Sequence, residues 1–210
     1  MSKYRRASLK IAGRPNISIR PNSLLELGCG INRDSIGDAS VVWMDIDIER
    51  LSPGLNSVCA QGERLPFADG SFDLVISRLA IPYMDIPVML REVNRVLKPG
   101  GIVWVSLHDI RYAGRRILQD IKGLHFRSVV FNLYSIANGL MLELSGRLYR
   151  FPLNNSILSI QTVRGMAKAL IRSGFSDVEF DDGTRVIVMA ARKDIQAHAE
   201  PQAFHATVGA

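Results

Sequence analysis

The sequence predicts an α/β protein built on a mostly parallel β-sheet with helices on both faces. Three observations predict this class: short apolar runs bounded by turn residues, helical periodicity between those runs, and a hairpin pattern after the last helix. Apolar runs without polar alternation are typical of strands buried on both faces, which parallel sheets place between layers of helices. We therefore expect one such sheet, closed by an antiparallel hairpin strand near the C-terminus.

Four parallel strands are expected in the first half of the chain. They are the apolar runs 24–27, 41–44, 73–77 and 102–107. The turn Lys98-Pro99-Gly100-Gly101 precedes the fourth run and favours a sharp turn into that strand. The first two runs end at Gly28 and Asp45, at the carboxyl ends of strands, where open parallel sheets bind their ligands.

The clearest helix is expected between the third and fourth strands. Asp85 is a suitable N-cap because its carboxylate can accept from the free N–H groups of a first turn, and Pro87 is tolerated there. Apolar residues then recur at helical spacing from Ile86 to Leu97, until Pro99 ends the pattern.

The last part of the chain predicts a second helix followed by a hairpin. The helix is expected from Thr162, its cap, to Ser173, with Gly174 as its C-terminal stop. The segments 178–180 and 184–190 flank the turn sequence Asp-Asp-Gly, which is typical of a β-hairpin.

The whole net charge of +6 lies in the first twenty residues. Residues 1–20 hold six basic and no acidic side chains, and the remaining residues hold twenty of each. Such an arm can attract phosphate groups or anionic lipids, but a solvated tail is the more common interpretation. We therefore expect a basic N-terminal arm at 1–20, a single domain at 21–194 with an insertion at 111–150, and a flexible tail at 195–210.

The cysteines and the N-terminal residues favour a reducing, cytoplasmic location. Cys29 and Cys59 are too few to hold a small secreted scaffold together. The basic residues Lys3, Arg5 and Arg6 are not followed by the apolar stretch of a secretory signal. The sequence also offers no set of ligands at metal-binding spacing, so no metal site is expected.

The first strand runs directly into a glycine turn, Glu26-Leu27-Gly28-Cys29-Gly30. Glycines let the backbone turn sharply and approach a ligand closely. Asp45 follows the second strand fifteen residues later, where a carboxylate can accept from both hydroxyl groups of a ribose. The dinucleotide fingerprint G-x-G-x-x-G is incomplete because Arg33 stands at its last position, which counts against a dehydrogenase.

Four motifs in register extend this pattern. They are Glu26-Leu-Gly-Cys-Gly30, Val41-Val-Trp-Met-Asp45, Leu65-Pro-Phe-Ala-Asp-Gly-Ser-Phe-Asp73 with the Leu-Val-Ile-Ser77 that follows it, and Arg91-Glu-Val-Asn-Arg-Val-Leu-Lys-Pro-Gly-Gly101. In this order they resemble the class I S-adenosylmethionine-dependent methyltransferases, specifically the type 11 group that acts on small molecules. The resemblance covers residues 24–107 closely and 162–192 loosely. It implies a Rossmann-like sheet of seven strands, S-adenosylmethionine as cofactor, and methyl transfer as the activity.

The resemblance also implies which residues hold the cofactor. The family's first motif lies against the methionine and ribose parts, the acid after the second strand binds the ribose hydroxyls, and a later acid accepts from the adenine amino group. Gln61 stands in place of that later acid, and its amide oxygen can also accept. The backbone carbonyl of Ser77 would meet the ammonium group. The implied cofactor-binding residues are Glu26, Gly28, Gly30, Asp45, Ile46, Gln61, Gly62 and Ser77.

The sequence departs from the family pattern after the glycine turn. Asn32 replaces the third glycine, and the stretch between Gly30 and Asp45 is about one helical turn shorter than in most relatives. The first crossover helix is therefore expected to shrink to little more than a turn at 34–37, leaving the cofactor pocket more open there. Relatives that share this shortening resemble enzymes from glycan and lipopolysaccharide clusters.

His108 is the candidate catalytic residue. It follows the fourth strand, and its neutral imidazole could take the proton of a hydroxyl acceptor near pH 7. A sulfonium methyl is already activated, so the protein has mainly to align the acceptor and exclude water. Tyr83 stands where relatives often carry a histidine and could instead wall the pocket. A purely structural role for His108 stays open.

The insertion at 111–150 is expected to form a helical lid over the acceptor. Its most apolar part, 126–144, is too short to span a bilayer and is interrupted by charged and amide side chains. The alternative is peripheral contact with a membrane surface through this insertion and the arm at 1–20.

The expected function is transfer of a methyl group to a small-molecule, glycan or lipid-linked acceptor, with oxygen as the accepting atom. One alternative is a non-catalytic partner subunit of the same fold, in which the changes at Asn32 and Gln61 have removed cofactor affinity. Another is a methyltransferase that acts on RNA or protein through the basic arm. Nucleic-acid acceptors are less expected, because the Asn/Asp-Pro-Pro-Tyr motif of amino-methylating DNA enzymes is missing after the third strand.

Overall fold

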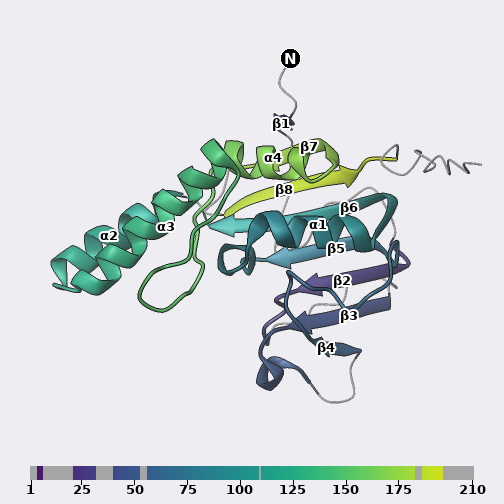
Figure 1. Ribbon diagram of the computed structural model, residues 1–210, viewed down its shortest axis with the longest axis horizontal. Helices are drawn as coiled ribbons and strands as arrows, with labels where there is room; N and C mark the ends of the chain where they lie inside the picture. Colours follow the sequence, from purple (N-terminus) through teal and green to yellow (C-terminus); the bar gives the residue numbers. More distant parts are fainter. Residues whose placement is uncertain are drawn as a thin grey trace, which may run out of the picture.

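The computed structural model in Figure 1 describes residues 4–6, 21–31, 40–52, 56–108, 110–182 and 186–195. Its centre is a sheet of eight strands in the order β1-β7-β8-β6-β5-β2-β3-β4. The strands are β1 (Tyr4–Arg6), β2 (Ser23–Leu27), β3 (Ser40–Asp45), β4 (Ser57–Cys59), β5 (Phe72–Arg78), β6 (Leu97–His108), β7 (Phe175–Asp181) and β8 (Val186–Lys193). The helices are η1 (Ile48–Arg50), η2 (Ile81–Tyr83), α1 (Ile86–Val96), α2 (Ile110–Lys122), α3 (Phe126–Ser145) and α4 (Val163–Arg172), of which η1 and η2 are short 3₁₀ turns.

The strand directions confirm the expected mixed, mostly parallel sheet. Parallel pairing joins β4 to β3, β3 to β2, β2 to β5, and β5 to β6. Strand β8 lies antiparallel between β6 and β7, as a closing hairpin requires. These seven strands form the Rossmann-like sheet, and β1 adds an eighth strand parallel to β7. Three residues of the basic arm therefore form an edge strand.

Alternate residues of each strand pack into two separate apolar clusters. The larger cluster lies between the sheet and helices α1 and α4, and includes Leu25, Val75 and Val103. The smaller cluster on the opposite face includes Leu24 and Trp104. Because successive side chains of a strand point to opposite faces, neighbours such as Leu24 and Leu25 enter different clusters. The stretch between β2 and β3, where the first crossover helix and Asn32 were expected, lies outside the described residues at 32–39.

The two expected helices begin at the expected caps. The Asp85 carboxylate accepts from the backbone N–H of Val88 at 3.4 Å, and the Thr162 hydroxyl accepts from Gly165 at 2.9 Å. After α1 the chain enters β6 at Leu97, five residues earlier than expected. The turn still requires glycine, because a Cβ on Gly101 would lie 2.9 Å from the carbonyl oxygen of Lys98.

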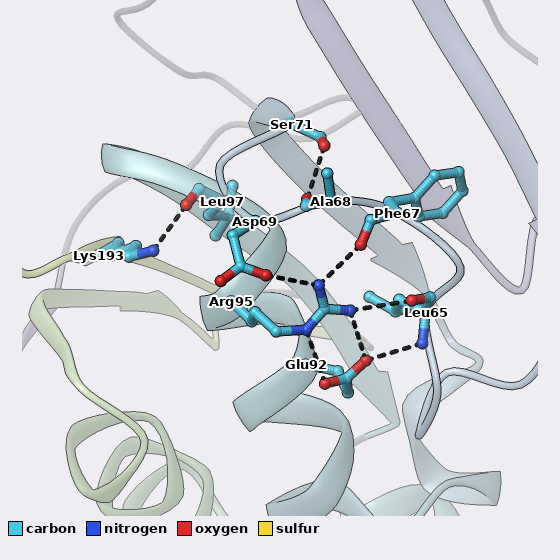
Figure 2. A network of polar contacts seen from close by, with 9 residues as sticks. All are labelled: Leu65, Phe67, Ala68, Asp69, Ser71, Glu92, Arg95, Leu97 and Lys193. Carbon is cyan, nitrogen blue, oxygen red and sulfur yellow. Dashed lines mark hydrogen bonds and ion pairs between the residues drawn. The ribbon is translucent and has the colours of Figure 1, made fainter.

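The loop between β4 and β5 is fixed to helix α1 by one guanidinium group (Figure 2). Arg95 donates to the carbonyl oxygens of Leu65 and Phe67 at 2.9 and 2.7 Å. It also donates to the carboxylates of Glu92 and Asp69 at 2.8 to 3.0 Å. Arg95 thereby holds the pKa of the Glu92 carboxyl below its usual value. All five N–H groups of the guanidinium donate hydrogen bonds, so the loop that begins at residue 61 is fixed to helix α1.

Helices α2 and α3 project together from one end of the sheet (Figure 1). The C-terminal half of α3 packs on α4, where the Thr162 hydroxyl donates to the Glu143 carboxylate at 2.7 Å. The chain then returns along α3, and Asn138 donates to the carbonyl oxygen of Leu158 at 3.1 Å. Gly139 is required here, because a Cβ on it would collide with the carbonyl oxygen of Ile160. No helix in the described residues is long and apolar enough to span a membrane.

Candidate functional site

The candidate site lies at the carboxyl ends of the parallel strands. From β2 the chain crosses outward to β3 and β4, and then returns to β5 on the other side of β2. Strands β2 and β5 therefore form the point at which the topology reverses, and open parallel sheets bind ligands at that point. Residues 26–30 follow or end β2, and Ser77 lies near the end of β5.

The two glycines of the turn after β2 have different surroundings. Gly28 and Gly30 have φ values of +65° and +57°, which favour glycine. A Cβ on Gly28 would collide with the Cβ of Ala80, whereas a Cβ on Gly30 would meet none of the described residues within 4 Å. Gly28 is thus required for packing against the chain after β5, and Gly30 is not crowded by any residue that the structure describes.

Asp45 ties this turn to the end of β3. Its side chain is buried, and its Oδ2 accepts from the backbone N–H of Gly30 at 2.9 Å. Its Oδ1 accepts from the N–H of Asp47 at 3.0 Å. Since each carboxylate oxygen can accept more than one hydrogen bond, both keep capacity for a ligand hydroxyl. The carboxylate is therefore held in one orientation before any ligand binds.

Three further predicted residues lie along the same edge, next to Asp45. Ile46 follows it and is 67% exposed, and Gln61 is exposed after β4. The N–H of Ala60 donates to the Asp45 carbonyl oxygen at 3.1 Å, which brings the start of the 61–64 loop to the end of β3. Gly62 is buried, and a Cβ on it would lie 2.8 Å from the Sδ of Met84.

Ser77 and Glu26 are both buried and both already make contacts between strands. The Ser77 hydroxyl donates to the carbonyl oxygen of Leu27 at 3.1 Å. Arg78 donates to the two oxygens of the Glu26 carboxylate from Nε and Nη2, at 2.8 and 2.9 Å. The Glu26 carboxylate therefore joins β2 to β5 in a bidentate ion pair, and its contact with a cofactor stays a prediction.

Arg78 is a residue that the sequence reasoning missed. Glu26 pairs with Ile76 in the register of β2 and β5, so Arg78, two residues on, presents its side chain on the same face as Glu26. A basic residue at that offset is the signal that could have identified the pair.

His108 ends β6, which lies beside β5 at the same edge of the sheet. Its side chain is half-buried, and burial lowers the pKa of the imidazole below its usual value of 6.5. Burial therefore favours the neutral form of the imidazole, which is the form that a general base needs. Tyr83, in η2, is 68% exposed.

Two buried polar side chains in this region have no hydrogen-bond partner among the described residues. They are Ser159 and Gln161, which are 0% and 1% exposed. The N–H of Ser159 donates to the carbonyl oxygen of Pro82 at 3.0 Å, so their segment lies against η2, just beyond β5. No sequence pattern identified them. Unpaired buried polar groups cost stability, which makes them candidates for ligand contacts. The described residues contain no group of three metal-ligating side chains.

Comparisons with known proteins agree with this geometry. A family model described as "Methyltransferase domain" matches residues 25–105. A malonyl-[acyl-carrier protein] O-methyltransferase of Dechloromonas aromatica is 34% identical over 125 residues, which are 52% of this chain and 47% of that protein. A protein of the same name from Erwinia pyrifoliae is 28% identical over 181 residues, 78% of this chain and 68% of that protein.

A solved structure supports the fold. It is 1,6-didemethyltoxoflavin-N1-methyltransferase of Burkholderia thailandensis, with bound 1,6-didemethyltoxoflavin and S-adenosylhomocysteine. It matches with a TM-score of 0.54 and 17% identity, over 83% of this chain and 72% of that chain.

The reversal of strand order, the glycine turn and the buried acid after β3 define a Rossmann-like protein of the nucleotide-cofactor class. Within that class, residues 25–105 match the methyltransferase-domain family model, and the relatives that carry a functional name are methyltransferases. The chain spans about half the length of its Dechloromonas aromatica relative.

Proposed function

We propose that this chain binds S-adenosylmethionine at the carboxyl edge of β2 to β5 and transfers its methyl group to an oxygen atom of a small-molecule, glycan or lipid-linked acceptor. The observation that carries the proposal is the Asp45 carboxylate, which is buried, oriented by the N–H groups of Gly30 and Asp47, and still able to accept. The O-methyltransferase names of two relatives support oxygen as the accepting atom.

The residues present fit the cofactor. Gly28 and Gly30 make the turn, and the space next to Gly30 that the described residues leave would admit a ligand close to the backbone. Asp45 would accept from the ribose hydroxyls with its remaining lone pairs. Gln61 would accept from the adenine amino group, and the Ser77 carbonyl would accept from the ammonium group. When bound, the cofactor supplies an activated methyl group on a sulfonium centre.

His108 would act as the general base. Its imidazole, whose neutral form is favoured because burial lowers its pKa, would take the proton of an acceptor hydroxyl as the oxygen attacks the methyl carbon. Ser159 and Gln161 supply unpaired donors and acceptors for a hydroxylated or amide-bearing acceptor near η2. The part of the chain from 147 to 161 thus fits the covering role expected of the lid better than the projecting α2 and α3. A cytoplasmic location is part of the same proposal.

Calorimetric titration of the full chain with S-adenosylmethionine and S-adenosylhomocysteine tests the cofactor site. Asp45→Ala is expected to weaken both by roughly tenfold to a hundredfold, because it removes charge-assisted hydrogen bonds. The control is Asp177→Asn, which removes an equal charge from an exposed position on β7 and is expected to leave affinity unchanged. Absence of binding by the wild-type chain would overturn the proposal and favour a non-catalytic partner subunit.

Turnover of an acceptor found by screening hydroxylated small molecules, glycans and lipid-linked glycans tests the base. His108→Gln is expected to lose about 10²-fold to 10⁴-fold in rate at unchanged cofactor affinity. Equal rates for the variant and the wild-type would remove His108 from the mechanism without affecting the cofactor site.

A further inference from the structure

Helix α3 has an unusual distribution of side chains: its inner face is small and polar, and its outer face is apolar. The buried residues of the inner face are Ser135, Asn138, Gly139 and Leu142. Asn138 donates to the carbonyl oxygens of Tyr149 and Leu158 and accepts from the N–H of Tyr149. Beside the buried Leu142, the inner face therefore presents polar and small side chains to the returning chain, which needs hydrogen bonds and close approach there.

The outer face carries a continuous row of exposed apolar side chains, which we call the outer stripe. It consists of Phe126, Val130, Leu133, Leu140, Met141 and Leu144, which are 70%, 54%, 54%, 43%, 37% and 74% exposed. At about 100° per residue, all six lie within roughly 60° of one direction, opposite the buried face. No polar residue falls inside this sector. The stripe is about 27 Å long, five turns of helix.

The end of the helical pair extends this apolar surface. Leu118 and Ile121 of α2 and Leu124 of the connecting turn are 61%, 52% and 72% exposed. The α2–α3 pair projects from one end of the sheet (Figure 1), and the side chains of the stripe and of this tip are exposed. Contiguous exposed apolar surface of this kind marks a site of interaction.

The charge around the stripe identifies the chemistry of its partner. Residues 110–150 hold seven basic and two acidic side chains. Asp120 accepts from Asn132 at 2.9 Å, and Glu143 binds Thr162 and Arg164, so both acids are engaged within the protein. Exposed basic residues remain beside the stripe and the tip, namely Arg115, Arg116, Lys122 and Arg127. A two-fold dimer in which this surface faces itself would bring like charge against like charge.

We propose that the outer stripe and the tip of the α2–α3 pair bind the surface of an anionic phospholipid membrane. The helix would lie in the plane of the interface, with the stripe in the acyl boundary and the basic side chains at the phosphate groups. This agrees with the absence, in the described residues, of a helix that could cross the bilayer. The proposal does not depend on the methyl-transfer reaction, although it would bring the candidate site close to lipid-linked acceptors.

Flotation of the full chain with vesicles tests the proposal. The wild-type chain is expected to float with vesicles of equal parts phosphatidylglycerol and phosphatidylcholine, and at least tenfold less with phosphatidylcholine alone. Leu133→Gln/Leu140→Gln is expected to lose about tenfold or more of the binding to anionic vesicles, because apolar insertion is removed without any change of charge. The control is Ile195→Gln, which replaces a still more exposed isoleucine just beyond β8, outside the helical pair.

The charge contribution is tested separately with Arg115→Gln/Arg127→Gln, which is expected to weaken binding to anionic vesicles and to reduce its dependence on salt. All these positions are exposed, so thermal unfolding is expected to match the wild-type. Equal flotation of the stripe variant and the wild-type would overturn the proposal and assign any binding to other basic residues. Self-association of the wild-type that the stripe variant abolishes, seen by sedimentation velocity, would also overturn it in favour of a second copy.

Discussion

The edge of the sheet and helix α3 place their polar and apolar side chains in opposite ways. At the sheet edge, buried polar groups such as Glu26 and Ser77 pair with a neighbouring strand, and apolar side chains fill the clusters on either face. In α3 the polar side chain of Asn138 is inside and Leu133 and Leu144 are outside. A strand can satisfy its backbone within the sheet, whereas the chain that returns along α3 has no strand partner. It therefore draws its hydrogen bonds from side chains of the helix.

The comparison teaches that apolar content alone does not locate the core. The 126–144 segment is rich in apolar residues, yet several of them, such as Leu133 and Leu144, face solvent because much of the inner face is used for polar contacts. Where a fold places apolar surface outside in this way, the surface is available for another partner.

The largest expected loss of unfolding free energy comes from a substitution at Gly28, which is closely packed at the edge of the sheet. Gly28→Ala is expected to lose about 3 kcal/mol of unfolding free energy or more, since it combines a positive φ with a Cβ that would collide with that of Ala80. Gly30 has a similar φ, but a Cβ there would meet none of the described residues within 4 Å. Gly30→Ala is therefore expected to lose only about 1 kcal/mol of unfolding free energy. Urea denaturation measures both. The double variant Gly28→Ala/Ala80→Gly should recover the difference between them, and no recovery would place the strain elsewhere.

A smaller effect is expected at the loop below the candidate site, and it depends on pH. Arg95 lowers the pKa of Glu92 below its ordinary value of 4.5, so this pair contributes stability above that pH and loses it as the pH falls through the folded pKa. Glu92→Gln is expected to cost about 1 to 3 kcal/mol at pH 7, because it removes the less exposed of the two carboxylates that pair with Arg95. The deficit should close as the wild-type is titrated below pH 4.5.

Urea denaturation between neutral and acid pH follows this difference. The control is Glu49→Gln, an exposed carboxylate on η1, which is expected to track the wild-type throughout. A Glu92→Gln deficit that stayed constant with pH would mean that shape, and not charge, holds the 65–69 loop.

Much of the sheet and the cofactor edge could be predicted because local signals there agree with the fold. Asp85 caps α1 as predicted, and the apolar runs that contain Leu25 and Val75 became buried parallel strands. Strand β4 was missed because Ser57-Val58-Cys59 is too short and too polar for a pattern; its pairing with β3 defines it.

The features that could not be predicted depend on contacts between distant segments. The ion pair of Glu26 with Arg78 requires the register of β2 against β5, fifty residues apart in the chain. In the 126–144 segment, Asn138 was interpreted as an interruption of an apolar helix. It is instead the residue on which the returning chain is built, and only the position of Leu158 shows this.

The smallest expected effect concerns Gln161, a buried polar side chain. In the described residues it pairs neither with a neighbouring strand, as Glu26 does, nor with a returning segment of chain, as Asn138 does. Its amide is 1% exposed, and neither of its polar atoms has a partner in the described residues. If the amide only fills space, Gln161→Leu removes an unpaired polar group and is expected to raise the unfolding free energy by about 1 kcal/mol. If it also binds the acceptor, the same variant gains stability and raises KM for the acceptor, with cofactor affinity unchanged. Urea denaturation and turnover of a screened acceptor separate the two roles. A loss of stability would show that the amide makes hydrogen bonds in the folded protein, and would contradict both roles. The control is Ile160→Leu, on the same segment, which keeps the volume and leaves the amide in place.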